Sequence, residues 1–97
     1  MTIVMLYQTT VKPEAIEKMD EIRNGFKAIY KKHGLDVLGH WKSVDSPHES
    51  FYMVQYDSED DYHHKTRTLH DDEQYLRLTS QLNEVRTDFK SIKLEPK

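Results

Sequence analysis

Apolar positions form two continuous runs and two weaker ones, and these predict four strands. Within the predicted strand 2–10, residues 3–7 are apolar without alternation, and residues 51–56 are the second apolar run, a pattern typical of strands covered on both faces. Residues 36–44 and 87–94 are more polar and predict edge strands. The intervening segment Asp45-Ser46-Pro47-His48 predicts a turn that joins 36–44 to 51–56 in a hairpin, because proline fixes φ and Asp and Ser bond their own backbone. We expect any pocket to open beside this hairpin.

Between the first two strands the apolar spacing changes to three and four residues, which predicts a helix over residues 13–32. Its apolar stripe comprises Ile16, Met19, Ile22, Phe26, Ile29 and Tyr30. Pro13 suits the first helical turn, and Gly34 after three basic residues is a stop signal. Gly25 weakens the middle of this helix by about 1 kcal/mol relative to alanine. We expect close packing against the sheet to explain it.

Two shorter helices are predicted after the hairpin. Ser58 begins the first in a capping-box pattern with Asp61 in place of Glu. Asp72 is positioned to cap the second after an interruption at residues 70–72. The apolar positions of the two helices are Tyr62, Thr66 and Leu69, then Tyr75, Leu78, Leu82 and Val85.

The order of these elements predicts the fold class. A β-α-β-β-α-α-β order predicts an α+β, ferredoxin-like βαββα(α)β domain whose four-stranded antiparallel sheet has the order 4-1-3-2, with the helices on one face. At 97 residues the chain forms one domain over 1–97. Its other sheet face is also apolar, since Phe51 and Met53 point away from Tyr52 and Val54. An uncovered face of roughly 400 Å² predicts a homodimer packed sheet to sheet.

Composition excludes several classes of protein. The net charge of −3 provides no basic footprint for nucleic acid, and no segment approaches the roughly 20 apolar residues of a membrane span. The absence of cysteine excludes disulfides, thiolate metal sites and a cysteine nucleophile. The N-terminal residues lack the features of a signal peptide, so we expect a cytoplasmic protein. Protonation of all six histidines would reverse the sign of the net charge.

Several short motifs resemble those of the NIPSNAP family. Gly39-His40-Trp41 resembles its G-x-W, Tyr56-Asp57-Ser58 its Y-D-S, and residues 69–75 its L-x-x-D-x-x-W with Tyr75 in place of the tryptophan. Residues 7–13 and Lys32-His33-Gly34 are similar to its Y-x-x-x-x-K-P and K-H-G, whereas Tyr62 stands where the family often has arginine. The resemblance implies a dimeric α+β barrel, a superfamily that includes cofactor-free monooxygenases, isomerases and haem-degrading enzymes.

The hairpin and the first strand hold the candidate ligand-binding residues. Trp41 and Gly39 share a face, so the indole can form an aromatic wall for a flat ligand or pack in the core beside the glycine. The phenols of Tyr7, Tyr52 and Tyr56 can donate to an enolate or carbonyl oxygen, or serve as packing with satisfied hydroxyls.

Histidines are the candidate acid–base groups. His40 faces away from Trp41, and His33 lies at a helix C-terminus, where it either caps the helix or acts at the mouth of a pocket. His63, His64 and His70 lack the spacing of a metal site, and no phosphate loop or Ser-His-Asp signature occurs. We therefore expect no metal and no organic cofactor.

Three functions remain compatible with these patterns. The first is a NIPSNAP-like homodimer that binds a small aromatic molecule. The second is a cofactor-independent monooxygenase or isomerase with His40 or His33 as base and Tyr7 or Tyr56 as oxyanion donor. The third is a protein-interaction module whose dimer surface is its function.

Overall fold

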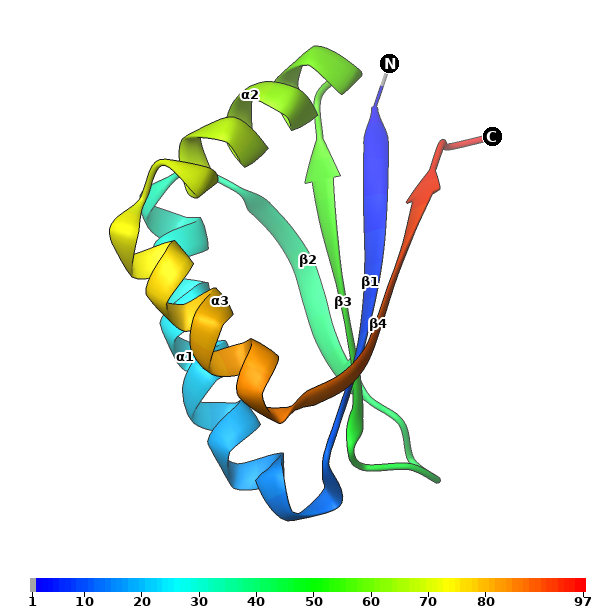
Figure 1. The fold of residues 1–97 in the computed structure, drawn as a ribbon. Coiled ribbons are helices and arrows are strands. Elements are labelled where there is room, and N and C mark those ends of the chain that lie inside the picture. The colour runs from blue at the N-terminus through cyan, green and yellow to red at the C-terminus, as the bar shows by residue number, and fades with distance from the viewer. Residues whose placement is uncertain (1) are drawn as a thin grey trace.

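The computed structural model describes residues 2–97, and it places one antiparallel sheet beneath a layer of helices (Figure 1). The sheet order is β2-β3-β1-β4, which is the predicted order 4-1-3-2 counted from the opposite edge. The predicted α+β fold class is confirmed. The elements in chain order are β1 (Ile3–Val11), the 3-10 turn η1 (Pro13–Ala15), α1 (Ile16–Lys32), β2 (Asp36–Lys42), β3 (Glu49–Tyr56), α2 (Glu59–His70), α3 (Glu73–Val85) and β4 (Arg86–Leu94).

The predicted helix boundaries have the expected capping groups. Ser58 Oγ accepts a hydrogen bond from the Asp61 amide at 3.0 Å and begins α2. Asp72 Oδ1 accepts from the amide of Gln74 at 2.9 Å and begins α3. α1 ends before Gly34, whose φ of 71° lies in the left-handed region that favours glycine. Local sequence therefore sets where the helices start and stop.

Gly25 allows α1 to approach another helix closely. A Cβ built on Gly25 would lie 2.8 Å from Leu78 Cδ1 of α3. The expectation that Gly25 packs against the sheet is therefore wrong. The two helices lie side by side over the sheet, and the small residue lets them come together.

The buried face of the sheet follows the two-residue period of a strand. In the central strands Ile3, Met5, Val54 and Tyr56 point under the helices and are almost fully buried. Together with the α1 residues Ile22 and Phe26 and their neighbours they form one hydrophobic core. The core thus lies between the central strands and the helix layer.

A bulge in β2 decides which hairpin residues face this core. Val37 pairs with Val54, and the next paired residue is Gly39 with Met53, so the register shifts by one residue at Leu38. Beyond the shift, His40 lies opposite Tyr52 on the helix side and Trp41 lies opposite Phe51 on the other side. The bulge therefore places the histidine inside and the tryptophan outside.

No helix covers the opposite sheet face within residues 2–97 (Figure 1). Leu6 and Ile92 are register partners there, as are Val4 and Leu94. Ile92 and Trp41 are each 52% exposed, and Leu38 and Leu94 are exposed as well. We call this surface, formed by Val4, Leu6, Leu38, Trp41, Phe51, Met53, Ile92 and Leu94, the open face.

The helices of residues 2–97 are all too short or too polar to cross a bilayer.

Candidate functional site: a tyrosine-lined cavity under the helices

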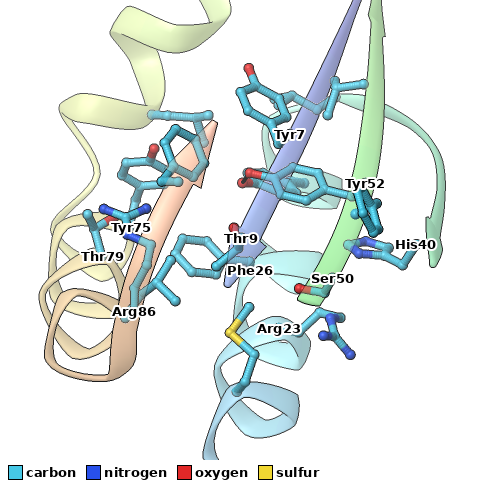
Figure 2. Close-up of a pocket in the computed structure, with 18 of the residues that line it drawn as sticks. Tyr7, Thr9, Arg23, Phe26, His40, Ser50, Tyr52, Tyr75, Thr79 and Arg86 are labelled. Atoms are coloured by element: carbon cyan, nitrogen blue, oxygen red, sulfur yellow. Dashed lines mark hydrogen bonds between the residues drawn. The ribbon is translucent and has the colours of Figure 1, made fainter. Parts of the chain in front are cut away.

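A cavity of about 120 Å³ lies between the helix layer and the sheet (Figure 2). All three helices and all four strands contribute side chains to its wall. Five of the six tyrosines of the chain line it: Tyr7, Tyr30, Tyr52, Tyr56 and Tyr75. His40, Ser50 and Tyr52 of the hairpin are part of the wall, as expected for a pocket beside this hairpin.

The floor of the cavity is a row of four stacked rings, one from each strand. His40 of β2 stacks on Tyr52 of β3 with a centroid distance of 5.4 Å. Tyr52 stacks on Tyr7 of β1 at 4.7 Å, and Tyr7 on Phe89 of β4 at 6.0 Å. Within each of these three pairs, the planes of the two rings are inclined by only 21–24°. We call His40, Tyr52, Tyr7 and Phe89 the aromatic row, and it gives one side of the cavity an aromatic wall.

The phenols of the cavity are proton donors at neutral pH. Burial, followed by the neighbouring phenol of Tyr30, raises the pKa of Tyr52 well above its ordinary value of 10.0. Burial likewise raises the pKa of Tyr7 and of Tyr56 above that value. Tyr30 and Tyr52 share a hydrogen bond between their hydroxyls at 3.3 Å. The wall therefore presents O–H groups to an oxygen of a ligand.

Two polar atoms of the wall have no partner within residues 2–97. Nε2 of His40 and Oγ1 of Thr79 are buried and make no hydrogen bond. Figure 2 shows His40 beside Tyr52 at the hairpin and Thr79 beside Tyr75 on α3. Leaving such a group unsatisfied costs roughly 1–3 kcal/mol, so each atom has hydrogen-bonding capacity for a molecule in the cavity.

His40 is held in its neutral form. Burial lowers the pKa of His40 below its ordinary value of 6.5, and the positive charges of Lys27 and Arg23 lower it further. A neutral imidazole carries one N–H and one lone pair. Nε2 of His40 is therefore able either to donate a hydrogen bond or to accept a proton, depending on the tautomer.

The structure brings His40, Tyr7, Tyr52 and Tyr56 together but leaves His33 outside the cavity wall. His33 Nε2 lies 2.7 Å from Asp72 Oδ2, where it connects α1 to α3.

Trp41 and Gly39 also lie apart from the tyrosine-lined cavity. A Cβ on Gly39 would lie 2.9 Å from Cη2 and Cζ2 of Trp41, so the indole packs directly over the glycine. Trp41 borders a second hollow of about 210 Å³ at the β2 edge, together with His40, Arg23 and His48. The assignment of Trp41 to a ligand site stays a prediction, now for this second hollow.

Six polar residues of the cavity wall were not predicted as site residues: Thr9, Arg23, Ser50, Thr66, Thr79 and Arg86. In the sequence, Arg23 follows Ile22 of the apolar stripe, and Arg86 follows Val85 at the end of a helix. Thr79 follows the apolar Leu78, which is the only sequence signal for its inward position. Residues 2–97 contain no group of three or more His, Asp or Glu side chains arranged to hold a metal ion.

Comparison with solved structures identifies the class of fold. No family model and no curated protein matches the sequence. A NIPSNAP family protein from Agrobacterium tumefaciens str. C58 superposes with a TM-score of 0.90 at 17% identity, covering 100% of this chain and 94% of that one. A NIPSNAP domain protein from Burkholderia xenovorans gives a TM-score of 0.87 at 14% identity over 98% of this chain and 94% of that one.

A third structure extends the likeness to an enzyme. An antibiotic biosynthesis monooxygenase gives a TM-score of 0.79 at 14% identity, covering 97% of both chains. The chain therefore has a ferredoxin-like α+β fold of the kind shared by these proteins. Within this class its fold is that of the NIPSNAP proteins, and the resemblance in fold inferred from the sequence is confirmed.

Proposed function

We propose that this chain is a NIPSNAP-like small-molecule-binding domain whose ligand lies on the aromatic row. The observation that carries the proposal is the pair of buried, unpartnered polar atoms, His40 Nε2 and Thr79 Oγ1, on the wall of one cavity. Binding sites typically combine an apolar, aromatic wall with a few polar groups that orient the ligand. This cavity has that composition.

Its size favours a small ligand. Apolar cavities of about 150 Å³ accept one benzene ring, and this cavity of about 120 Å³ is comparable. We therefore expect a ligand built on a single planar ring.

Benzamide is a suitable first probe, because it is a neutral single ring with both hydrogen-bond donors and an acceptor. In NMR spectra we expect it to shift the methyl resonances of Met19, Val54 and Leu82, which line the cavity. The methyl groups of Ile92 and Leu94 on the open face are the internal control and are expected to stay in place. Shifts confined to Ile92 and Leu94, or no shifts at all, would contradict the proposal.

Thr79→Val separates binding from folding. This substitution removes a hydroxyl that has no partner, so we expect the melting temperature to stay constant or rise while benzamide binds more weakly. Thr68→Val is the matched control, because the Thr68 hydroxyl donates to the His64 carbonyl at 3.0 Å, an exposed contact outside the cavity. Unchanged benzamide binding in Thr79→Val would remove Thr79 from the site.

The same proposal includes a homodimer formed through the open face. The face carries exposed apolar side chains on strands of both edges, among them Trp41 and Ile92. Stable protein interfaces bury about 800 Å² per partner, and a second copy of the open face would supply a surface of matching shape and chemistry.

A second candidate function is that of a cofactor-independent isomerase or monooxygenase acting on an aromatic or enolisable substrate. The specific observation that favours it is a neutral His40 with an unpartnered Nε2 in the same row as protonated phenols. In the tautomer with a lone pair on Nε2, His40 would take a proton from a carbon next to a carbonyl group. A phenol such as Tyr7 or Tyr56 would donate to the enolate oxygen that forms.

The two reactions differ in what the enolate reacts with. In an isomerase the proton returns to another carbon of the same substrate. In a monooxygenase the enolate reacts with O₂, one oxygen atom stays on the carbon as a carbonyl, and the other leaves as water with the two hydrogens that the carbon loses.

Exchange of carbon-bound hydrogen tests this second function without a known substrate. We expect the protein to accelerate exchange of the acidic CH₂ hydrogens of phenylpyruvate in D₂O above the buffer rate, measured by NMR. His40→Gln should abolish the acceleration, and His33→Gln, the matched control, should retain it. The base must be neutral, and the pKa of His40 is lowered from 6.5, so the exchange rate catalysed by the protein should fall only at pH values below 6.5. Equal exchange in wild type and His40→Gln would reject His40 as the base.

A further inference from the structure

The only charged side chains on the cavity wall within residues 2–97 are two arginines. Arg23 and Arg86 line the cavity, and no aspartate or glutamate does. This contrasts with the chain as a whole, whose net charge is −3. The local excess of positive charge favours a ligand with an anionic group.

The two arginines differ in whether their charge is already neutralised. Arg23 Nη1 lies 2.8 Å from Asp20 Oδ1, so Arg23 has a carboxylate partner. Arg86 makes no ion pair within residues 2–97, and its hydrogen-bond partner is the neutral Asn83 side chain. Of the two guanidinium groups, that of Arg86 therefore has charge and donors available for a ligand.

Arg86 is held over the end of the aromatic row. Its Cζ lies 4.7 Å from the ring centroid of Phe89, a cation–π contact that holds the guanidinium close to the ring. A guanidinium is planar and is suited to bidentate recognition of a carboxylate.

Thr79 and Tyr75 add hydroxyl donors on the same side of the cavity (Figure 2). Thr79 Oγ1 is buried and unpartnered. Burial raises the pKa of Tyr75, and the neighbouring Thr79 hydroxyl, followed by the charge of Arg86, acts on the same phenol in the opposite direction. Arg86, Thr79 and Tyr75 thus gather on one side of a cavity that lacks acidic groups.

From this arrangement we infer that the ligand is a single-ring aromatic carboxylate, with its ring on the aromatic row and its carboxylate at Arg86 and Thr79. The inference rests on the proposed ligand-binding function and assigns the ligand's charge and orientation. The opposite end of the ring then points toward His40, which lies at the other end of the aromatic row.

Benzoate and benzamide form the probe pair, because they share size and shape but differ in charge. Hydrogen bonds to a charged group contribute about 1.5–3 kcal/mol, which corresponds to about a tenfold to hundredfold preference for benzoate. Calorimetric or NMR titrations at constant ionic strength measure the two dissociation constants. A preference of this size supports the inference.

Four variants locate the carboxylate. Arg86→Gln is expected to remove the preference for benzoate while benzamide still binds. Arg77→Gln is the matched control, because Arg77 is an exposed residue of α3 that lines a different surface hollow. Arg23→Gln tests the other arginine of the wall and is expected to retain most of the preference. Thr79→Val removes only a hydroxyl group and should weaken benzoate binding. This variant therefore tests the position of the carboxylate even if Arg86→Gln fails to fold.

The outcomes separate this inference from the function on which it rests. Equal affinity for benzoate and benzamide would overturn the carboxylate inference and leave the binding function intact. Loss of the preference in Arg23→Gln or Arg77→Gln, with Arg86→Gln unchanged, would overturn the assignment to Arg86. Failure of both compounds to bind would overturn the inference together with the binding function.

Discussion

His33 Nε2 lies 2.7 Å from Asp72 Oδ2, and this contact joins the C-terminal end of α1 to the N-terminal end of α3. Lys32 Nζ approaches the same oxygen at 3.3 Å. The second oxygen, Oδ1, accepts from the amide of Gln74 and so caps α3. One carboxylate therefore connects basic residues at a helix C-terminus to the amides of a helix N-terminus, which the two helix dipoles favour.

Substitution of Asp72 is expected to lower stability in two separable steps. Asparagine still caps a helix but carries no charge, whereas alanine removes both the cap and the charge. We therefore expect the melting temperature to decrease from wild type to Asp72→Asn and again to Asp72→Ala. Glu73→Gln, which alters a neighbouring exposed carboxylate, is the control and should have little effect. An unchanged melting temperature in Asp72→Ala would show that this contact does not stabilise the fold.

The contribution of Asp72 has a predictable pH dependence. The hydrogen bond from His33, with the Lys32 contact and the backbone amides, holds the pKa of Asp72 below its ordinary value of 3.8. A carboxylate whose pKa is lower in the folded than in the unfolded protein contributes its full stabilisation at pH values above the unfolded pKa. This stabilisation decreases progressively as the pH falls below the unfolded pKa. The difference in melting temperature between wild type and Asp72→Asn should shrink as the pH falls below 3.8. A difference that grows on acidification would contradict this.

The open face is expected to form a homodimer. Ile92 is 52% exposed on this face, and Leu76 is 47% exposed on α3 in the helix layer. Sedimentation at micromolar concentration should give twice the chain mass for wild type and for Leu76→Glu. Ile92→Glu should give a monomer, because a charge buried in an apolar interface without a partner is costly. A monomeric wild type, or equal behaviour of the two variants, would exclude this interface.

Trp41, the only tryptophan of the chain, is a direct probe of the same face. Its indole is half exposed, so Trp41→Ala should leave the protein folded. Truncation of a buried aromatic side chain, by contrast, lowers the free energy of unfolding by roughly 3–5 kcal/mol. Fluorescence emission should shift to shorter wavelength as concentration rises and the open face becomes covered.

A ligand site at Trp41 predicts a different response. A planar aromatic molecule bound in the second hollow would quench the emission at constant protein concentration, and Trp41→Ala would weaken its binding while the dimer persists. Unfolding of Trp41→Ala would instead show that the indole is needed for packing.

Metal and cofactor removal is expected to have no effect. The chain has no cysteine and no histidine pair with the spacing of a helical metal site. We expect elemental analysis and the absorption spectrum of the purified protein to detect no stoichiometric metal or chromophore, and EDTA to leave the melting temperature unchanged. Stoichiometric zinc, iron or haem, with a lower melting temperature after its removal, would contradict this.

Short-range physics explains what the sequence alone determined. The helix boundaries follow from Ser58, Asp72 and Gly34, each of which acts within a few residues of its own position. The strands follow from local apolar runs, and the sheet order follows from the element order and the handedness of crossovers. Tyr7, Tyr52 and Tyr56 were predicted as ligand-binding candidates for the same reason, since they lie on the inner strands.

Only the tertiary structure decided how distant elements meet. The bulge at Leu38 turns His40 inward and Trp41 outward, and alternation along a strand specifies only that neighbours differ, not which one is inside. The proximity of Thr79 and Arg86 to the aromatic row depends on how α3 packs over the sheet and how β4 pairs with β1. Gly25 likewise meets Leu78 because two helices separated by the hairpin and α2 pack together. These contacts join residues far apart in the chain, so no local pattern specifies them.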